Sequence, residues 1–153
     1  GVQTCALPIW KVYMERRGMD QTELMDAIDS FSGSDGAVLF AVCGGRVSEG
    51  IDFPDKSLEL AVIVGIPYPY MSAKIKALER YFNLKFGDGW ERVAARPAAR
   101  KMRQSRGRLI RSGEDRGACV VLDRRVAALE GYDSRGTEDP ESEVSVFFSL
   151  GNR

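Results

Sequence analysis

AVLFAVCGGRVSEGIDF, residues 37–53, begins with six apolar residues (37–42) and continues into a glycine-rich segment. An apolar run without polar alternation is typical of a strand that is buried on both faces. Similar runs recur at LAVIVGI (60–66) and ACVVLD (118–123), and VSVFF (144–148) is a weaker fourth. We therefore expect four short strands inside a sheet.

Helical patterns lie between these runs. Asp20 and Glu23 have the spacing of a capping box, and apolar residues follow them at helical intervals. Ser72 begins a second helical pattern that Gly87 would end, and Pro97 suits the first turn of a third. Strands that alternate with helices predict βαβ units, so we expect a three-layer α/β fold around a parallel sheet.

The composition is that of one globular domain. The chain has 153 residues, of which 44% are hydrophobic and 29% charged, and its formal net charge is zero. Because there is no global attraction to nucleic acid, any anion must bind to a local patch. No apolar run is long enough to cross a membrane. Cys5, Cys43 and Cys119 show no metal-site spacing, which favours a reducing, cytoplasmic compartment.

Two terminal segments are set apart from the fold. Residues 1–9, GVQTCALPI, back-translate to a sequence that resembles a common sequencing adapter, so we interpret them as an artefact and begin the domain near Trp10. A native N-terminal strand is the alternative. Residues 130–143 hold six acids and one arginine, and we expect a solvated loop there.

The glycine-rich segment CGGRVSEGIDFPD (43–55) directly follows the first strong strand. In open α/β sheets, ligands bind beyond the carboxyl ends of the strands. Glycines in such a segment let backbone N–H groups turn toward a ligand. Glu49 and Asp52 add two carboxylates, which suit a hydroxyl group or metal-bound water better than a phosphate. A purely structural turn is the alternative interpretation.

The third helical pattern is strongly basic. Between residues 92 and 111 there are eight basic residues and no acid: Arg92, Arg96, Arg100, Lys101, Arg103, Arg106, Arg108 and Arg111. Lys101, Gln104, Arg108 and Arg111 are separated by three, four and three residues, so they share one face of a helix. Arginine matches phosphate oxygens in pairs. This face therefore predicts an anion site, with a solvated basic surface as the alternative.

Two further features of this helix support that interpretation. Ala98, Met102 and Leu109 lie on the opposite face, where we expect them to pack on the sheet. Gly107 would cost about 1 kcal/mol relative to alanine inside a helix. We therefore expect a ligand to approach the backbone closely beside Arg108.

QSRGRLIR (104–111) fits the Q-x-x-G-R-x-I-R pattern of motif VI in superfamily 2 helicases. GGRVSEGIDF (44–53) fits motif V in its XPD-like form, about fifty residues earlier. The chain thus resembles the second RecA-like motor domain of an XPD-type DNA helicase. The resemblance implies a RecA-like domain 2 of the P-loop NTPase type over residues 10–129, without the P-loop half, followed by an acidic loop and tail (130–153).

The resemblance also implies roles for individual residues. ATP with Mg²⁺ would be held mainly by an N-terminal domain of the same protein, and Arg108 and Arg111 would be the catalytic residues that reach its γ-phosphate. The residues expected to bind ATP are Gln104, Gly50, Asp52 and Glu49. The residues expected to lie near single-stranded DNA are Arg46, Ser48, Tyr68 and Tyr70.

The chain lacks other helicase motifs. It has no G-x-x-x-x-G-K-[ST], no histidine for a D-E-A-H box and no set of four cysteines for an iron–sulfur cluster. We expect the cluster only in the N-terminal half, and no ATP hydrolysis by this chain alone. The resemblance implies 5′→3′ translocation along single-stranded DNA, with no membrane partner. A non-catalytic nucleic-acid-binding or regulatory module and a helicase-like nuclease remain the alternatives.

Overall fold

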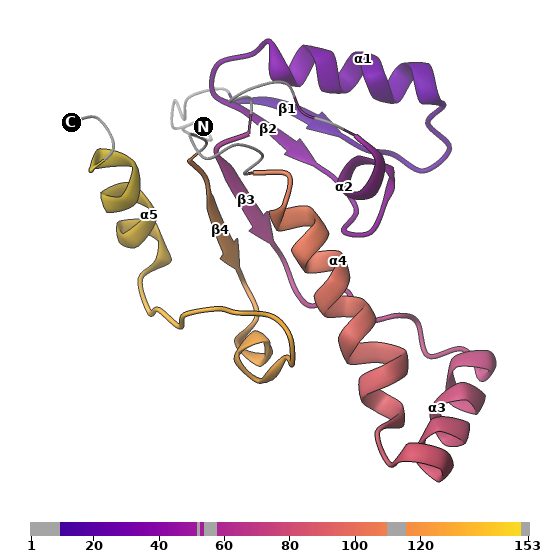
Figure 1. Ribbon diagram of the computed structural model, residues 1–153. Helices are drawn as coiled ribbons and strands as arrows, with labels where there is room; N and C mark the ends of the chain where they lie inside the picture. Colours follow the sequence, from indigo (N-terminus) through magenta and orange to yellow (C-terminus); the bar gives the residue numbers. More distant parts are fainter. Residues whose placement is uncertain (1–9, 52, 54–57, 110–115, 151–153) are drawn as a thin grey trace, which may run out of the picture.

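The computed structural model describes residues 10–51, 53, 58–109 and 116–150. Its strands form two parallel pairs (Figure 1). In the first pair Lys11 lies opposite Ala37, and in the second Leu60 lies opposite Ala118. The strands are β1 (Lys11–Met14), β2 (Ala37–Phe40), β3 (Leu60–Ile63) and β4 (Ala118–Val121). The predicted α/β class with parallel strands is confirmed.

Two of the strand predictions need correction. β1 was not predicted, because KVYM is too short to form an apolar run. The predicted strand at 144–148 is wrong, since these residues lie in α5 (Pro140–Ser149). The Asp139 side chain accepts a hydrogen bond from the Ser142 N–H, and Pro140 occupies the first helical turn. These local signals start a helix, whereas a five-residue apolar run by itself does not distinguish helix from strand.

The first and second predicted helices are confirmed, together with their caps. In α1 (Gln21–Ser32), the Asp20 carboxylate accepts from the Glu23 N–H at 2.8 Å, and the Glu23 carboxylate accepts from the Asp20 N–H at 3.1 Å. In α3 (Ala73–Phe86), Ser72 caps the first turn and Gly87 ends the helix in the left-handed conformation, at φ 79°. The start of α1 and both ends of α3 are therefore determined by residues within four positions of each cap.

The third predicted helix, from Pro97 to about Arg111, starts earlier and ends sooner than predicted, so Arg108 lies beyond its end, and it consists of two parts. A π-helical turn, η1 (Glu91–Ala95), continues into α4 (Arg96–Arg106). Ala98, Met102 and Leu109 are buried, as predicted. The expectation for Gly107 is wrong. It lies at the C-cap, where its N–H donates to the Arg103 carbonyl at 2.8 Å, so a glycine here does not interrupt a helix and indicates no close ligand.

Two hydrophobic clusters hold the helices against the strands. The α1 cluster consists of Leu24, Ile28, Phe31, Val47, Ile51 and Phe53. The α4 cluster consists of Ile63, Ile66, Ala95, Ala98, Ala99, Met102, Val126, Leu129 and Tyr132. The second cluster includes Val126 of the 3-10 helix η2 (Arg124–Ala128).

The segment expected to be a solvated loop contributes to this packing. Tyr132 is only 7% exposed and belongs to the α4 cluster, and Arg103 donates to the Gly131 carbonyl at 2.7 Å. Because acidic residues surround Tyr132 in the sequence, the pattern did not indicate that its side chain is buried. Packing in this part of the fold therefore extends past residue 129.

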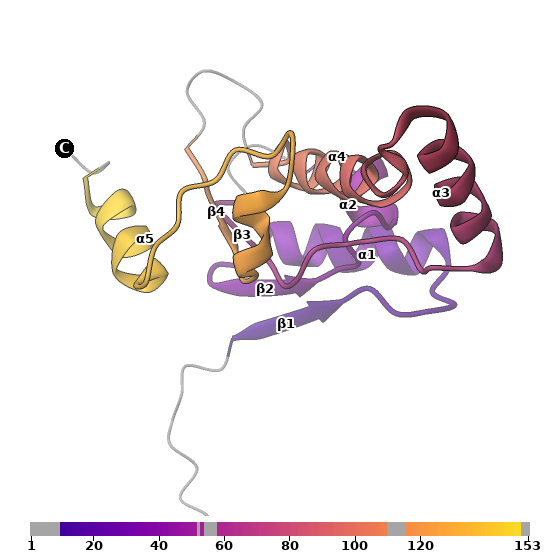
Figure 2. The ribbon, with the colours of Figure 1, turned by 90° about the horizontal axis from the view of Figure 1, so that it is seen from below.

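Helices α1, α2 and α4 lie on one side of the strands (Figure 2). On the opposite side Val12, Met14, Phe40 and Val62 are about half exposed. The described residues therefore form two layers, and the third layer that the sequence predicts is not among them. No helix in the described ranges is both long and apolar enough to cross a membrane.

Replacement of Met102 by alanine is expected to lower the free energy of unfolding by about 2–5 kcal/mol, because the fully buried side chain would leave a cavity under α4. Chemical denaturation of the 153-residue chain measures this. Met25→Ala on α1 is the control, since Met25 is 37% exposed, and it should change the stability by less than about 1 kcal/mol. Equal losses in the two variants would contradict the packing described.

Candidate functional site

The carboxyl end of β2 leads into a tight turn that is fixed by one side chain. The Ser48 hydroxyl accepts from the Gly44 N–H at 2.7 Å and lies 3.3 Å from the Val42 carbonyl and 3.2 Å from the Gly45 carbonyl. Ser48 lies in the short helix α2 (Arg46–Gly50) and is only 9% exposed. Its hydroxyl therefore serves the turn itself.

The turn contacts α4 at Gly44. Its φ of 81° is in the left-handed region, and a Cβ placed on it would lie 2.7 Å from Cδ of Lys101 and 2.9 Å from Cε. A side chain at this position would thus be strained and would also collide with Lys101. A second contact joins the same elements, because the Cys43 sulfur lies 3.4 Å from the Ser105 hydroxyl.

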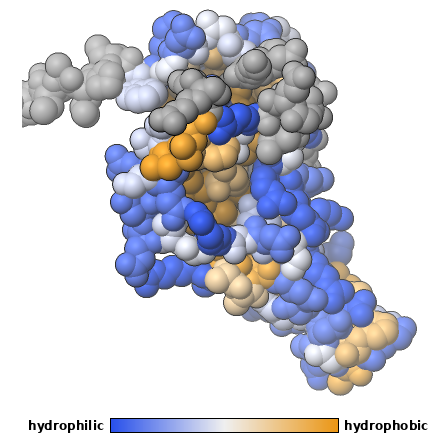
Figure 3. Space-filling view, turned by 60° about the vertical axis from the view of Figure 1, so that its left-hand side comes forward, coloured by the Kyte–Doolittle hydropathy of each residue, from blue (hydrophilic) through white to orange (hydrophobic). Residues whose placement is uncertain are grey.

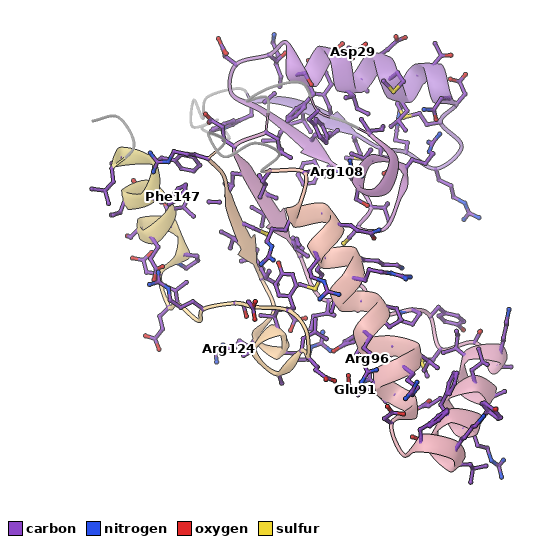
Figure 4. All side chains as sticks on the ribbon, viewed as in Figure 1. Asp29, Glu91, Arg96, Arg108, Arg124 and Phe147 are labelled. Carbon is purple, nitrogen blue, oxygen red and sulfur yellow. The ribbon has the colours of Figure 1, made fainter. Side chains whose placement is uncertain are left out.

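Arg108 makes the third contact between the two segments. Its Nε donates to the backbone carbonyl of Ser48 at 3.2 Å, just beyond the end of α4 (Figure 4). Arg108 is half-buried. The structure therefore joins residues 43–50 to residues 101–108, which the sequence predicted as parts of one site. Gln104 is exposed on the last turn of α4.

A cavity of about 490 Å³ lies between the turn, α2 and the start of α1. Its lining residues are Gln21, Gly44, Gly45, Arg46, Gly50 and Ile51. Gly50, predicted to bind ATP, and Arg46, predicted to lie near DNA, thus share one cavity wall. Gln21 was not predicted, although it is the first residue of α1.

Arg46 has partners within the protein. Its Nε lies 3.6 Å from a carboxylate oxygen of Glu15, and the other oxygen of that carboxylate accepts from the Val42 N–H. The Arg46 side chain is 41% exposed. The Glu15 side chain is only 9% exposed, so a ligand that drew Arg46 away would leave a largely buried carboxylate without this partner.

The two tyrosines predicted near DNA have different surroundings. Tyr68 packs against the α4 cluster, with its ring 5.3 Å from the Trp90 ring and 5.9 Å from the Arg125 guanidinium. Arg125 is held by Asp123 at 2.6 Å, and this hydrogen bond lowers the pKa of Asp123 to about 2. Tyr70, in contrast, is 89% exposed. Of the pair, Tyr70 is the one whose ring is open to a base.

Several of the basic residues near α4 are held by other parts of the chain. Arg92 contacts Asp88 at 2.6 Å, and Arg96 lies 3.9 Å from Asp88 and 3.8 Å from Glu130. Arg106 donates to the Asp133 carbonyl at 3.4 Å. The acids that pair with these arginines, Asp88 and Glu130, thus lie outside residues 92–111. The basic residues of 92–111 therefore form two groups. Arg92, Arg96 and Arg106 contact residues outside this segment, whereas Lys101 and Arg108 lie near the turn after β2.

Some predicted site residues cannot be placed. Arg111 and Asp52 lie outside the described residues, as does the side chain of Glu49. Their roles stay predictions. Among the residues that are described, no group of three or more acids and cysteines could hold a metal ion.

A family model described as the helicase C-terminal domain matches residues 6–135. The chain belongs to the helicase C-terminal domain family. It is 36% identical over 128 residues to a regulator of telomere elongation helicase 1 homolog of Culex quinquefasciatus, an alignment that covers 74% of this chain and 13% of that protein. It is 37% identical over 108 residues to a Fanconi anemia group J protein homolog of Gallus gallus, covering 65% of the chain and 8% of that protein.

These similarities confirm the resemblance to XPD-type helicases that the two motifs indicated. The chain spans about an eighth or less of the length of these curated relatives. The helicase C-terminal domain described here is therefore compared with one part of much longer proteins. The match identifies the family. It does not assign a role to any single residue.

Replacement of Ser48 by alanine is expected to lower the free energy of unfolding by about 1–3 kcal/mol, because the Gly44 N–H loses its acceptor in a half-buried turn. Denaturant unfolding followed by circular dichroism measures the loss. Ser30→Ala is the control, since Ser30 is exposed on α1 and alanine favours a helix. An unchanged stability in Ser48→Ala would show that the hydroxyl does not hold the turn.

Proposed function

We propose that this helicase C-terminal domain is a motor domain of an ATP-dependent DNA helicase and supplies arginines to ATP held by another domain of the same protein. The observation that carries the proposal is the contact between Arg108 and the Ser48 carbonyl. This contact holds an arginine that follows α4 against α2, in the segment after β2, and ligands of open α/β sheets bind beyond the carboxyl ends of the strands.

The chemistry of phosphoryl transfer suits this arrangement. The transferred group carries charge that must be neutralised, and an arginine finger contributes roughly 10³–10⁵ to the rate. A guanidinium has five N–H donors in a planar fork, so the contact through Nε also fixes the orientation of that plane. We assign Arg108 and Arg111 to the γ-phosphate, and Gln104 to the support of that contact.

The proposed DNA-binding surface includes the short helix α2. Gly50 and Arg46 line one cavity, and α2 begins at Arg46 and ends at Gly50. We assign Gly50, Asp52 and Glu49 to the nucleotide side, and Arg46 and the backbone at Ser48 to the single strand. Movement of the ATP-binding domain against Arg108 would then also displace the DNA contacts, which couples hydrolysis to translocation. The 5′→3′ direction is inherited from the resemblance.

The cofactors are assigned largely to the rest of the protein. Bound ATP supplies the phosphoryl group and Mg²⁺ neutralises its oxygens, and the side chains of Arg108 and Gln104 fit phosphate rather than metal. The described residues offer no cluster suited to a metal ion. We therefore assign Mg²⁺, and the iron–sulfur cluster implied by the resemblance, to the N-terminal half.

In the full-length helicase, Arg108→Ala is expected to lower kcat for DNA-stimulated ATP hydrolysis by roughly 10³-fold or more, because charge on the transferred phosphoryl group loses its arginine. The affinity for single-stranded DNA should stay unchanged. Arg108→Lys should restore little, since lysine lacks the planar fork. Steady-state turnover and fluorescence anisotropy measure the two quantities.

Arg100→Ala is the control for this prediction, since Arg100 is exposed on α4. It should leave kcat near the wild-type value. If Arg108→Ala abolished DNA binding while turnover of the bound complex held, Arg108 would contact DNA and the assignment would be wrong.

Tyr70→Ala should weaken the binding of single-stranded DNA by roughly 5- to 100-fold, which corresponds to the loss of about 1–3 kcal/mol of stacking on one base. The free energy of unfolding should not change, because Tyr70 is 89% exposed. Tyr68→Ala should show the opposite pattern, since its ring packs against Trp90. Equal DNA affinity of wild type and Tyr70→Ala would remove Tyr70 from the DNA surface.

A further inference from the structure

Helix α3 is largely uncovered by the rest of the chain. None of its side chains is buried, and it projects beyond the end of η1 and α4, away from the strands (Figures 1 and 2). Its contacts with the rest of the chain are made mainly to η1. Most of its surface is therefore open to a partner.

The two sides of α3 differ in chemistry. On the inner side, the Arg92 guanidinium lies 5.7 Å from the Phe82 ring and 4.3 Å from the Phe86 ring. Glu79, the one acid of the helix, is half-buried and lies on this same side at helical spacing. The rest of the helix surface, its outer side, carries four exposed cations in two rows, Lys76 with Arg80 along one edge and Lys74 with Lys85 along the other.

These four cations are not paired with acids. Within the described part of the chain, salt bridges involve Arg46, Arg92, Arg96, Arg125 and Arg135, and none involves a residue of α3. Lys85 instead contacts the Tyr81 hydroxyl at 3.3 Å. The outer side is thus a locally positive surface on a chain of zero net charge.

Exposed apolar groups lie among these charges. Tyr81 is 50% exposed and Leu84 82%, and polar and apolar residues lie side by side on the projecting end of the molecule (Figure 3). The cores of protein interfaces are depleted in lysine, whereas tracks for single-stranded nucleic acid combine cations with aromatic rings. The mixture on α3 therefore favours nucleic acid over an apolar protein partner.

Tyr70 lies just before this helix in the chain. The Ser72 N–H donates to the Tyr70 carbonyl at 2.8 Å, and Ser72 caps the first turn of α3. Tyr70 thus lies at the base of the helix, one turn before Lys74. We propose that the outer side of α3 extends the single-stranded DNA surface beyond Tyr70, with Lys74, Lys76, Arg80 and Lys85 binding phosphates. This inference rests on the DNA binding proposed above.

The test uses the 153-residue chain and a fluorescein-labelled oligothymidylate of about 20 nucleotides, followed by anisotropy between about 50 and 200 mM salt. The variant K76E/R80E reverses two neighbouring charges of α3. R16E/R17E is the matched control, because both arginines are exposed in the loop before α1 and the change in net charge is the same.

K76E/R80E should bind roughly tenfold or more weakly, and the slope of log K against log salt should fall by about 1.4, or about 0.7 for each lost phosphate contact. R16E/R17E should weaken binding clearly less than K76E/R80E does, because Arg16 and Arg17 follow Glu15, the partner of Arg46, and do not belong to α3. Circular dichroism and thermal unfolding should show that all three proteins are folded.

Three results would overturn the proposal: equal weakening in both double variants, wild-type affinity in K76E/R80E, or no binding by the wild-type chain at the lowest salt. Equal weakening would indicate general electrostatic attraction. Wild-type affinity in K76E/R80E would indicate that α3 contacts a protein partner rather than DNA. None of them bears on Arg108, whose role is measured by ATP turnover in the full-length protein.

Discussion

The approach of α4 to the turn after β2 is the constraint on which the rest of the site depends. It favours a glycine at position 44, because the backbone there is in the left-handed region and the flexible Lys101 side chain would have to move away from a Cβ. Once the two segments are in contact, the Ser48 carbonyl can accept from Arg108 at 3.2 Å. A displacement of either segment would remove the arginine from the carboxyl end of the strands.

Helix α2 connects the α1 cluster to α4. Its Val47 belongs to the α1 cluster, while its Ser48 contacts Arg108 beyond the end of α4. Because α2 has five residues, the proposed nucleotide side and the proposed DNA side are separated by one or two turns of helix. Under the proposed function, a rigid element of this length would transmit a change at one side to the other.

Predictions from the sequence succeeded where a signal was local and failed where a partner lay far along the chain. Asp20, Ser72 and Gly87 were identified as caps because their hydrogen bonds reach three or four residues. The run at 144–148 was misread, since the deciding cap lies outside it. Burial of Tyr132 could not be predicted, because its neighbours on α4 are some thirty residues away.

The sequence by itself determined the parallel α/β class, the start of α1, both ends of α3 and the two helicase motifs. Each of these depends on residue order over short distances, through periodicity, capping or spacing. Only the tertiary structure decided which arginines hold the fold and which reach the turn, that the Ser48 hydroxyl serves the backbone, and that Tyr70 is open while Tyr68 is packed. Several of these outcomes depend on contacts between residues more than twenty positions apart, such as Arg108 with Ser48 and Tyr68 with Trp90, and the packing of the whole domain sets such contacts.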